Sequence, residues 1–247
     1  MILDWLKTRL KAVSETPLFL KISPKPAGRR LVIPDIHGCI LTLEALIWRL
    51  DLKQEDQLFF LGDYINKGPD SRAVLDYLMD LATKFSDVHF LKGNHEDGLL
   101  RSHYRGTKAL KQYVKDYQSE NLLTNDQIPE KYVKFLESLA YYIDTGNYYL
   151  VHAGFNFSAR QPLKDFEAML FIRDYPIDKE FLGDKRIVHG HNPQNLNIIK
   201  NHIQEFSPVI PLDNGCVYAL QREGQGNLLC FDLDTQELTI QQNIDGL

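Results

Sequence analysis

The sequence predicts an α/β fold that begins with mainly parallel strands. Three short apolar runs, expected as strands at 31–34, 57–61 and 88–91, alternate with segments of helical spacing at 41–52 and 72–83. This β-α-β-α-β order is typical of parallel strands joined by helices. Later strands are separated only by short turns, which indicates that antiparallel strands complete the fold.

The two predicted helices rest on different signals. In the first segment apolar residues recur at helical spacing, namely Leu41, Leu43, Leu46, Ile47 and Leu50. Before the second segment, the turn Gly68-Pro69-Asp70-Ser71 offers an N-cap, which favours the start of a helix at this point.

From about 96 to 139 the pattern is helical, charged and rich in tyrosine, and no hinge composition isolates it. We therefore expect a helical insertion within a single domain spanning 1–247, with 1–27 as an N-terminal extension. Trp5, Leu6 and Leu10 would form the apolar side of a short helix there, packed on the domain. The other expected elements are a helix at 163–171, a hairpin at 141–144 and 148–151, a strand at 186–188, and antiparallel strands at 217–221, 227–233 and 237–241.

The composition excludes several classes of protein. The chain has 247 residues, of which 44% are hydrophobic and 25% charged, an ordinary soluble composition. Its net charge of −5, with both signs mixed, gives no electrostatic footprint for nucleic acid. No apolar run approaches the length of a membrane span, which is roughly 18 residues. Three isolated cysteines, in odd number, argue against disulfides and favour the cytoplasm: Cys39, Cys216 and Cys230.

Five polar motifs each follow a predicted strand, and their ordered set is the strongest functional signal. They are Asp35-Ile36-His37-Gly38, Gly62-Asp63, Gly93-Asn94-His95-Glu96, His152-Ala153-Gly154 and His189-Gly190-His191. One such motif alone is more often an ordinary turn. Together, at the carboxyl ends of strands where α/β sheets place ligands, they supply carboxylates, imidazoles and one carboxamide. That is the ligand inventory of a two-metal hydrolase.

This set resembles the calcineurin-like metallophosphoesterases, and more narrowly the bacterial type of the phosphoprotein (serine/threonine) phosphatase family. The resemblance covers roughly residues 31–234. It implies a four-layer α/β/β/α sandwich with two mixed sheets. It also implies a dinuclear metal site and phosphoester hydrolysis by a metal-bridging hydroxide. We expect two divalent ions, with manganese as the first choice and iron or zinc as alternatives, because carboxylate and imidazole donors accept all three.

The resemblance also assigns roles to single residues. It implies first-metal ligands Asp35, His37 and Asp63, and second-metal ligands Asp63, Asn94, His152 and His191. His95 would protonate the leaving oxygen, with Asn66 and Asp63 as its catalytic neighbours. The substrate phosphate would meet Arg173, Lys67, Lys92 and Asn94, although a surface ion pair with Asp174 is an alternative explanation for Arg173. His189 is expected outside the ligand set.

Three residues depart from the family pattern. Asn66 and Lys67 stand where the family has aspartate and arginine, and Lys92 stands where arginine is common. Asn66 can still accept a hydrogen bond from His95, but it brings no charge to stabilise the imidazolium. A lysine keeps the positive charge but cannot make the planar, two-pronged contact of arginine with phosphate.

Three functions remain open from the sequence. The first is a phosphatase acting on phosphoserine or phosphothreonine in proteins. The second is a hydrolase of dinucleoside tetraphosphates or other phosphoanhydrides and phosphodiesters, which Asn66 slightly favours because a good leaving group needs less help from His95. The third is a weakly active, metal-bound protein that recognises phosphorylated partners. A phosphorylated protein or a small phosphoester is thus the expected partner, without nucleic acid or membrane, and the oligomeric state stays open.

Overall fold

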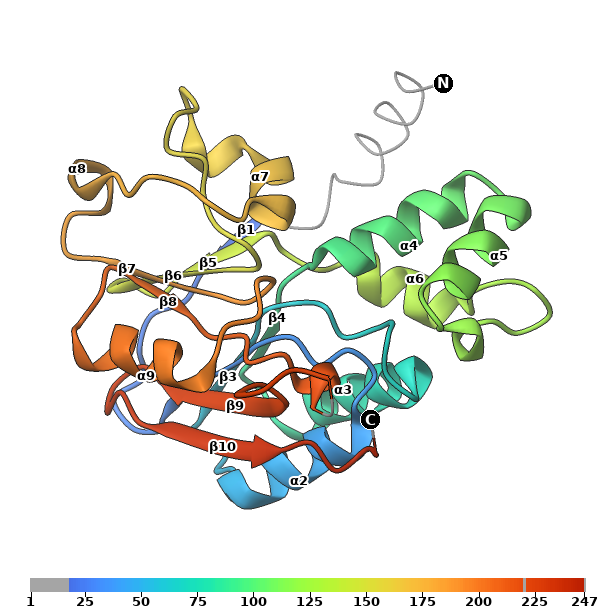
Figure 1. Ribbon diagram of the computed structural model, residues 1–247, viewed down its shortest axis with the longest axis horizontal. Helices are drawn as coiled ribbons and strands as arrows, with labels where there is room; N and C mark the ends of the chain where they lie inside the picture. The colour runs from blue at the N-terminus through green and yellow to red at the C-terminus, as the bar shows by residue number, and fades with distance from the viewer. Residues whose placement is uncertain (1–17, 220, 247) are drawn as a thin grey trace.

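The computed structural model describes residues 18–219 and 221–246, whose strands form two five-stranded sheets between layers of helices (Figure 1). The short helix expected around Trp5, Leu6 and Leu10 lies outside the described residues. No helix in the described part of the chain has the length and apolar character needed to cross a bilayer.

Sheet B combines the predicted parallel start of the chain with its antiparallel end. In spatial order it consists of β10 (Leu238–Gln242), β9 (Asn227–Asp232), β2 (Arg30–Ile33), β3 (Gln57–Phe60) and β4 (Val88–Phe90). The strands β2, β3 and β4 pair in parallel, which confirms the predicted β-α-β-α-β order. The antiparallel pair β9 and β10 is also confirmed, and β9 joins it to β2 in the same sheet.

Sheet A carries the other half of the strands. In spatial order it consists of β1 (Phe19–Lys21), β5 (Tyr142–Asp144), β6 (Tyr148–Val151), β7 (Arg186–His189) and β8 (Val209–Pro211). The hairpin of β5 and β6 is antiparallel, as predicted, whereas β6, β7 and β8 pair in parallel. The edge strands β1 and β8 are not predicted from the sequence, because each has only three residues. In addition, β8 contains Pro211, and proline weakens the strand signal because sheets accept it mainly at their edges.

Helices cover the outer face of each sheet. Against sheet B lie α2 (Ile40–Leu50) and α3 (Ser71–Lys84), whose N-cap Asp70 accepts a hydrogen bond from Ala73 N at 2.9 Å. The segment between β4 and β5 contains α4 (Asn94–Tyr104), α5 (Thr107–Asp116), η1 (Glu120–Leu122) and α6 (Glu130–Glu137). Over sheet A lie η2 (Pro162–Lys164), α7 (Phe166–Phe171) and α8 (Lys179–Leu182), at the top left of Figure 1.

The central core lies between the two sheets. Val32 and Phe59 of sheet B meet Leu150 and Val188 of sheet A there, and all four are fully buried. Burying such a side chain stabilises the fold by roughly 1.5–3 kcal/mol. The layers are therefore helix, sheet, sheet and helix, which confirms the expected α/β/β/α sandwich with two mixed sheets.

One predicted strand is wrong. The segment 217–221 was expected to be extended, but Cys216–Tyr218 form the short helix η3. It starts directly after Gly215, whose φ of 63° turns the chain into the left-handed region and breaks an extended run. The helix α9 (Leu196–Gln204), which follows β7, was not predicted.

Candidate active site

The predicted site residues converge where strands of both sheets end. Each motif follows its own element: Asp35 and His37 follow β2, Asp63 follows β3, Asn94 and His95 begin α4 after β4, His152 follows β6, and His191 follows β7. Parallel strands point the same way, so their carboxyl ends share one edge of a sheet. The packing of the two sheets then brings the two edges together.

The turns that carry these residues have an unusual backbone. Positive φ angles in non-glycine residues occur at His37 (49°), Asp63 (52°), Asn66 (74°), Lys67 (65°) and His191 (65°). Left-handed backbone is costly for such residues and is characteristic of functional sites. Here the cost is offset by fixed contacts, since Asp63 O accepts hydrogen bonds from the backbone N–H groups of Ile36 (3.0 Å) and His37 (2.9 Å).

Two glycines allow the carboxylates to approach the neighbouring backbone. A Cβ added at Gly93 would lie 2.1 Å from Asp63 Oδ1, and one at Gly190 would lie 2.0 Å from Asp35 Oδ1. Both distances are far inside van der Waals contact. Any larger residue would therefore push a proposed ligand out of place.

A first group of donors surrounds one oxygen of Asp63. Asp63 Oδ2 lies 3.5 Å from His37 Nε2 and 3.9 Å from His95 Nε2. Asp35 Oδ2 lies 3.9 Å from the same His37 nitrogen. His37, Asp63 and His95 thus place one ligand atom each within 4.8 Å of one another. The grouping includes His95, for which the sequence suggests proton transfer and not ligation.

A second group surrounds the other oxygen of the same carboxylate. Asp63 Oδ1 lies 3.6 Å from His152 Nε2, which lies 3.0 Å from Asn94 Oδ1 and 3.2 Å from His191 Nδ1. His191 Nδ1 lies 2.9 Å from Asn94 Oδ1. Ligand atoms around one ion with bonds of about 2.0–2.2 Å lie roughly 3 Å apart, so this spacing fits a metal ion. The two oxygens of Asp63 therefore face two different groups of donors.

Hydrogen bonds and burial leave the imidazoles in the form that binds metal. His37 Nδ1 donates to Ile65 O at 2.9 Å and His152 Nδ1 donates to Leu61 O at 3.0 Å, so both Nε2 atoms keep a free lone pair. Burial lowers the pKa of His191 to about 3 and places the pKa of His37 well below its ordinary value. Neutral imidazole is the form that a metal requires.

The Asp63 carboxylate is strongly favoured in its charged form. Burial alone would raise the pKa of Asp63, but attraction to His152, His95 and His37 in their protonated form, and to the Lys67 ammonium, outweighs it and holds the pKa below its ordinary value. A charged carboxylate with both oxygens facing donor groups suits two cations better than one. The donor set and its spacing thus fit a dinuclear metal centre.

His95 is oriented by two neighbours, one of which was not predicted from the sequence. Asn66 Nδ2 lies 2.7 Å from His95 Nδ1 and 3.0 Å from the Tyr113 hydroxyl, which itself donates to His95 O at 2.8 Å. The Asn66 amide nitrogen faces both partners, which leaves Asn66 Oδ1 buried without a hydrogen-bond partner among the described residues. Asn66 donates to His95, whereas the sequence suggested that it would accept.

The comparison with known families decides the identity of this site. The profile of the calcineurin-like phosphoesterases matches residues 28–229, which is most of the chain. The chain belongs to the calcineurin-like phosphoesterase family. It is a metal-dependent phosphoric ester hydrolase, and the two donor groups that share Asp63 are its candidate metal ligands.

Curated relatives of this phosphoesterase carry two kinds of name. A bis(5'-nucleosyl)-tetraphosphatase PrpE [asymmetrical] from Oceanobacillus iheyensis is 26% identical, and the match covers 76% of this chain and 84% of the relative. The enzyme of the same name from Anoxybacillus flavithermus is 27% identical over 77% of this chain. The mouse serine/threonine-protein phosphatase with EF-hands 1 is 28% identical, but the match covers only 46% of this chain and 18% of that protein.

Solved structures share the phosphoesterase fold at lower identity. A crystal structure of a protein provisionally named a diadenosine tetraphosphatase has a TM-score of 0.66 at 24% identity, covering 92% of this chain and 99% of its own. A serine/threonine phosphatase from Saccharomyces cerevisiae has a TM-score of 0.59 at 14% identity, covering 97% of this chain and 88% of its own. These likenesses support the fold.

The predicted phosphate-binding arginine of this phosphoesterase lies beside the second group. Arg173 Nη1 donates to Asn192 Oδ1 at 3.0 Å, and Asn192 directly follows His191 in the sequence. Burial is the larger cause of the low pKa of His152 and His191, but the charge of Arg173 lowers both further. Among the ion pairs of the described residues there is none between Arg173 and Asp174, which was the alternative explanation for this arginine.

The other predicted substrate residues of the phosphoesterase lie in different surroundings. Lys92 is buried, and its ammonium lies 5.5 Å from the centroid of the Tyr141 ring. Lys67 Nζ lies 2.8 Å from His37 Nε2, within the first group. His189, expected outside the ligand set, donates from Nδ1 to Gly190 O at 2.9 Å.

Two buried carboxylates of this phosphoesterase site were missed from the sequence. Glu96 accepts hydrogen bonds from three backbone N–H groups of the neighbouring turns, and burial followed by the charge of Asp63 raises its pKa to about 8. Asp213 follows β8, and its charge raises the pKa of Asp35 after the larger effect of burial. Glu96 was visible within its motif, whereas Asp213 follows a strand that was itself not predicted.

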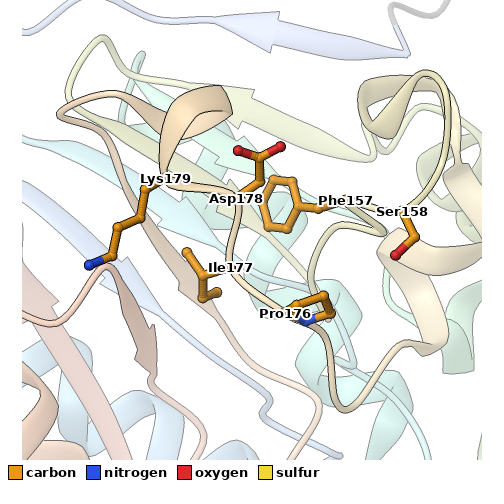
Figure 2. Close-up of a pocket in the computed structure, with 6 residues that line it drawn as sticks. All are labelled: Phe157, Ser158, Pro176, Ile177, Asp178 and Lys179. Carbon is orange, nitrogen blue, oxygen red and sulfur yellow. The ribbon is translucent and has the colours of Figure 1, made fainter.

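A surface pocket of about 540 Å³ lies in the loops over sheet A of the phosphoesterase and includes none of the predicted site residues. Figure 2 shows its lining side chains, which come from two loops and the first residue of α8: Phe157, Ser158, Pro176, Ile177, Asp178 and Lys179. The second loop continues from Arg173. Its Tyr175 packs on Gly154, where an added Cβ would lie 2.3 Å from the ring.

Proposed function

We propose that this phosphoesterase hydrolyses dinucleoside polyphosphates at a phosphoanhydride bond, giving two unequal nucleotides. The observation that carries the proposal is the donor contact from Asn66 Nδ2 to His95 Nδ1 at 2.7 Å. The relatives named asymmetrical bis(5'-nucleosyl)-tetraphosphatases support the same substrate class.

The contact matters because it fixes the proton of His95. An imidazole that accepts at Nδ1 carries its proton on Nε2, the nitrogen that lies 3.9 Å from Asp63 Oδ2 and faces the first group. With an amide donor behind it, in place of a carboxylate, the imidazolium is not stabilised. His95 is then a hydrogen-bond donor to the leaving oxygen and a weak source of protons. A phosphate leaving group is a weak base and needs no more than that.

The residues proposed to hold the two metal ions are those that the family resemblance implies, and the spacing of their donor atoms supports them. Asp35, His37 and Asp63 would hold the first ion, and Asp63, Asn94, His152 and His191 the second. Bound divalent ions would neutralise phosphoryl oxygens and activate a water molecule. Manganese is the proposed ion, with iron or zinc accepted by the same donors. Arg173 would bind a phosphate oxygen at the edge of the second group.

Hydrolysis of phosphoserine or phosphothreonine in proteins, the first expectation from the sequence, becomes the second candidate. Its support is the partial match to the mouse phosphatase, which covers 46% of this chain. Alkoxide leaving groups need a stronger acid than the His95 described above. The thiols of Cys39, Cys216 and Cys230 are free and buried, which fits a reducing compartment, and we propose that the enzyme acts in the cytoplasm.

A substrate competition tests the proposal. The manganese-loaded enzyme is assayed with diadenosine tetraphosphate, a phosphoserine peptide and para-nitrophenyl phosphate, and kcat/KM is compared. We expect the tetraphosphate to be preferred and to yield a nucleoside triphosphate and a nucleoside monophosphate. A preference for the peptide, or two equal nucleotide products, would contradict the proposal.

A further inference from the structure

The first group of donors already contains a cation of the protein itself. Lys67 Nζ lies 2.8 Å from His37 Nε2. His37 Nδ1 donates to Ile65 O, so Nε2 carries the lone pair and the Lys67 ammonium must be the donor. This lone pair is the one with which His37 would bind a metal ion. One lone pair cannot serve both partners at the same time.

The backbone directs Lys67 to this position. Asn66 and Lys67 are consecutive residues with φ angles of 74° and 65°, a strained pair outside glycine. Asn66 N donates to Ser71 Oγ at 2.8 Å and Lys67 N donates to Tyr117 O at 2.9 Å, so both residues are anchored. The side chain of Lys67 is half-buried and is held between its anchored backbone and His37.

Negative charge around the first group retains the ammonium. Asp35, Asp63 and Asp213 are almost fully buried, with exposed fractions of 2–3%. Buried carboxylates are costly without a nearby cation. Lys67 supplies part of that positive charge within the protein, as a metal ion would.

We propose that the Lys67 ammonium competes with the metal ion for the first position, so that this position fills only when Lys67 is displaced from His37. The inference holds whichever phosphoester is the substrate, and it depends on the proposed first-metal ligands. Lysine at this position would then have a role in metal loading that the arginine of the family pattern, a phosphate contact, does not have.

The Tyr218 ring also lies near the ammonium in this position, since Lys67 Nζ is 5.6 Å from the ring centroid, within the range of a cation–π contact. The second group has no comparable competitor, because the described hydrogen-bond partners of His152 Nε2 are Asn94 Oδ1 and His191 Nδ1. The second position should therefore fill first and bind more tightly.

Titration with Mn²⁺ alone tests the competition without any substrate. Free Mn²⁺ is followed by its electron paramagnetic resonance signal for the metal-stripped full chain and for Lys67→Met. The weaker of the two dissociation constants should tighten about tenfold, as expected for loss of a hydrogen bond involving a charged group, and the tighter constant should not change. The increase in Tm on adding Mn²⁺ should also be larger in Lys67→Met than in the wild type.

Two controls separate this effect from a change in net charge or folding. Lys84→Met removes an exposed ammonium from α3 and should leave both constants unchanged. In a His37→Ala background, Lys67→Met should have a much smaller effect, because the contested lone pair is gone and only the charge of Lys67 is removed. Lys67→Gln replaces Lys67→Met if circular dichroism shows that the methionine variant is not folded.

Three outcomes would overturn the inference. The first is that the dissociation constant of the weaker Mn²⁺ site in Lys67→Met is equal to or larger than the wild-type value. The second is an equal gain in affinity in the His37→Ala background. The third is weaker inhibition by inorganic phosphate with both Mn²⁺ constants unchanged, which would make Lys67 a phosphate ligand only. Failure of the wild type to bind Mn²⁺ would instead remove the proposed ligand set on which the inference depends.

Discussion

Glu96 Oε2 accepts a hydrogen bond from the backbone N–H of Asp63 at 2.8 Å, and the same oxygen accepts from Gly93 N at 2.9 Å. Glu96 Oε1 accepts from Tyr64 N at 2.9 Å. One buried carboxylate thus ties the turn after β3 to the turn after β4. The distance between Asp63 and Asn94, two proposed ligands of the second ion, depends on this connection.

Glu96→Ala should both destabilise the protein and weaken metal binding. Three backbone N–H groups lose their acceptor, and each buried unsatisfied donor costs about 1–3 kcal/mol. Urea unfolding of the metal-free protein measures the first effect, and a Mn²⁺ titration measures the second. Glu44→Ala, on the exposed face of α2, is the control and should change neither. A wild-type Mn²⁺ affinity in Glu96→Ala would show that the ligand positions do not depend on Glu96.

Asp63→Asn should abolish turnover and lower the metal content. The substituted side chain would keep one carbonyl oxygen and place an amide group on the other side, so it could no longer serve both donor groups. Metal content is measured by mass spectrometry after gel filtration, together with the rate of phosphoester hydrolysis. Asp51→Asn removes an exposed carboxylate and should have no effect. Full activity of Asp63→Asn would rule out the dinuclear site.

Asn66→Asp should raise activity most on substrates with poor leaving groups. A carboxylate behind His95 would stabilise the imidazolium and make it a better acid. The ratio of kcat/KM for an alkyl phosphate or phosphoserine peptide to that for para-nitrophenyl phosphate should therefore increase. Tyr113→Phe keeps the amide at position 66 and serves as a comparison for simple loss of a contact. Equal gains on both substrates would remove the role assigned to Asn66.

The sequence predicted the parts of the site that are encoded locally. Asp35, Asp63 and His152 each stand just after an apolar run, and such a run with a polar turn marks the end of a buried strand. The carboxyl ends of parallel strands then meet by geometry alone. For this reason the residue pattern was enough to place the motifs together.

The contacts between these motifs could not be predicted in the same way. Tyr113 lies 47 residues after Asn66 in the sequence and reaches it only because α5 packs on α4. That packing decides which end of the Asn66 amide faces His95. Likewise, the position of Lys67 on His37 depends on a left-handed backbone at two non-glycine residues, which no pattern of residue types predicts.

The Asp56 carboxylate should make stability depend on acid pH. It accepts hydrogen bonds from Arg29 N and Lys53 N, both at 2.9 Å, and contacts the Arg29 side chain. Burial would raise its pKa, but these hydrogen bonds outweigh burial and hold the pKa below the ordinary value. A lowered pKa stabilises the fold above the unfolded pKa of about 3.9, and this contribution is lost as the pH falls through the lower folded value.

The measurement is urea unfolding of the metal-free protein across acid pH. At pH 7 Asp56→Asn should be less stable than the wild type by about 1–3 kcal/mol. The difference should shrink once the pH falls below about 4. Asp80→Asn, a more exposed carboxylate on α3, should give no such trend. A difference that stays constant down to the lowest pH at which the protein is folded would contradict the assignment.

Arg173→Met should weaken phosphate binding and leave metal binding intact. The guanidinium is fixed by Asn192 beside the second group, where it can present planar donors to a phosphate oxygen. Loss of such a charge-assisted contact should raise both KM and the inhibition constant of inorganic phosphate by about tenfold. Arg160→Met removes an exposed arginine earlier in the same region and should change neither constant. If both variants weaken phosphate inhibition equally, the effect belongs to the general positive charge of this region, and Arg173 has no specific contact with the substrate.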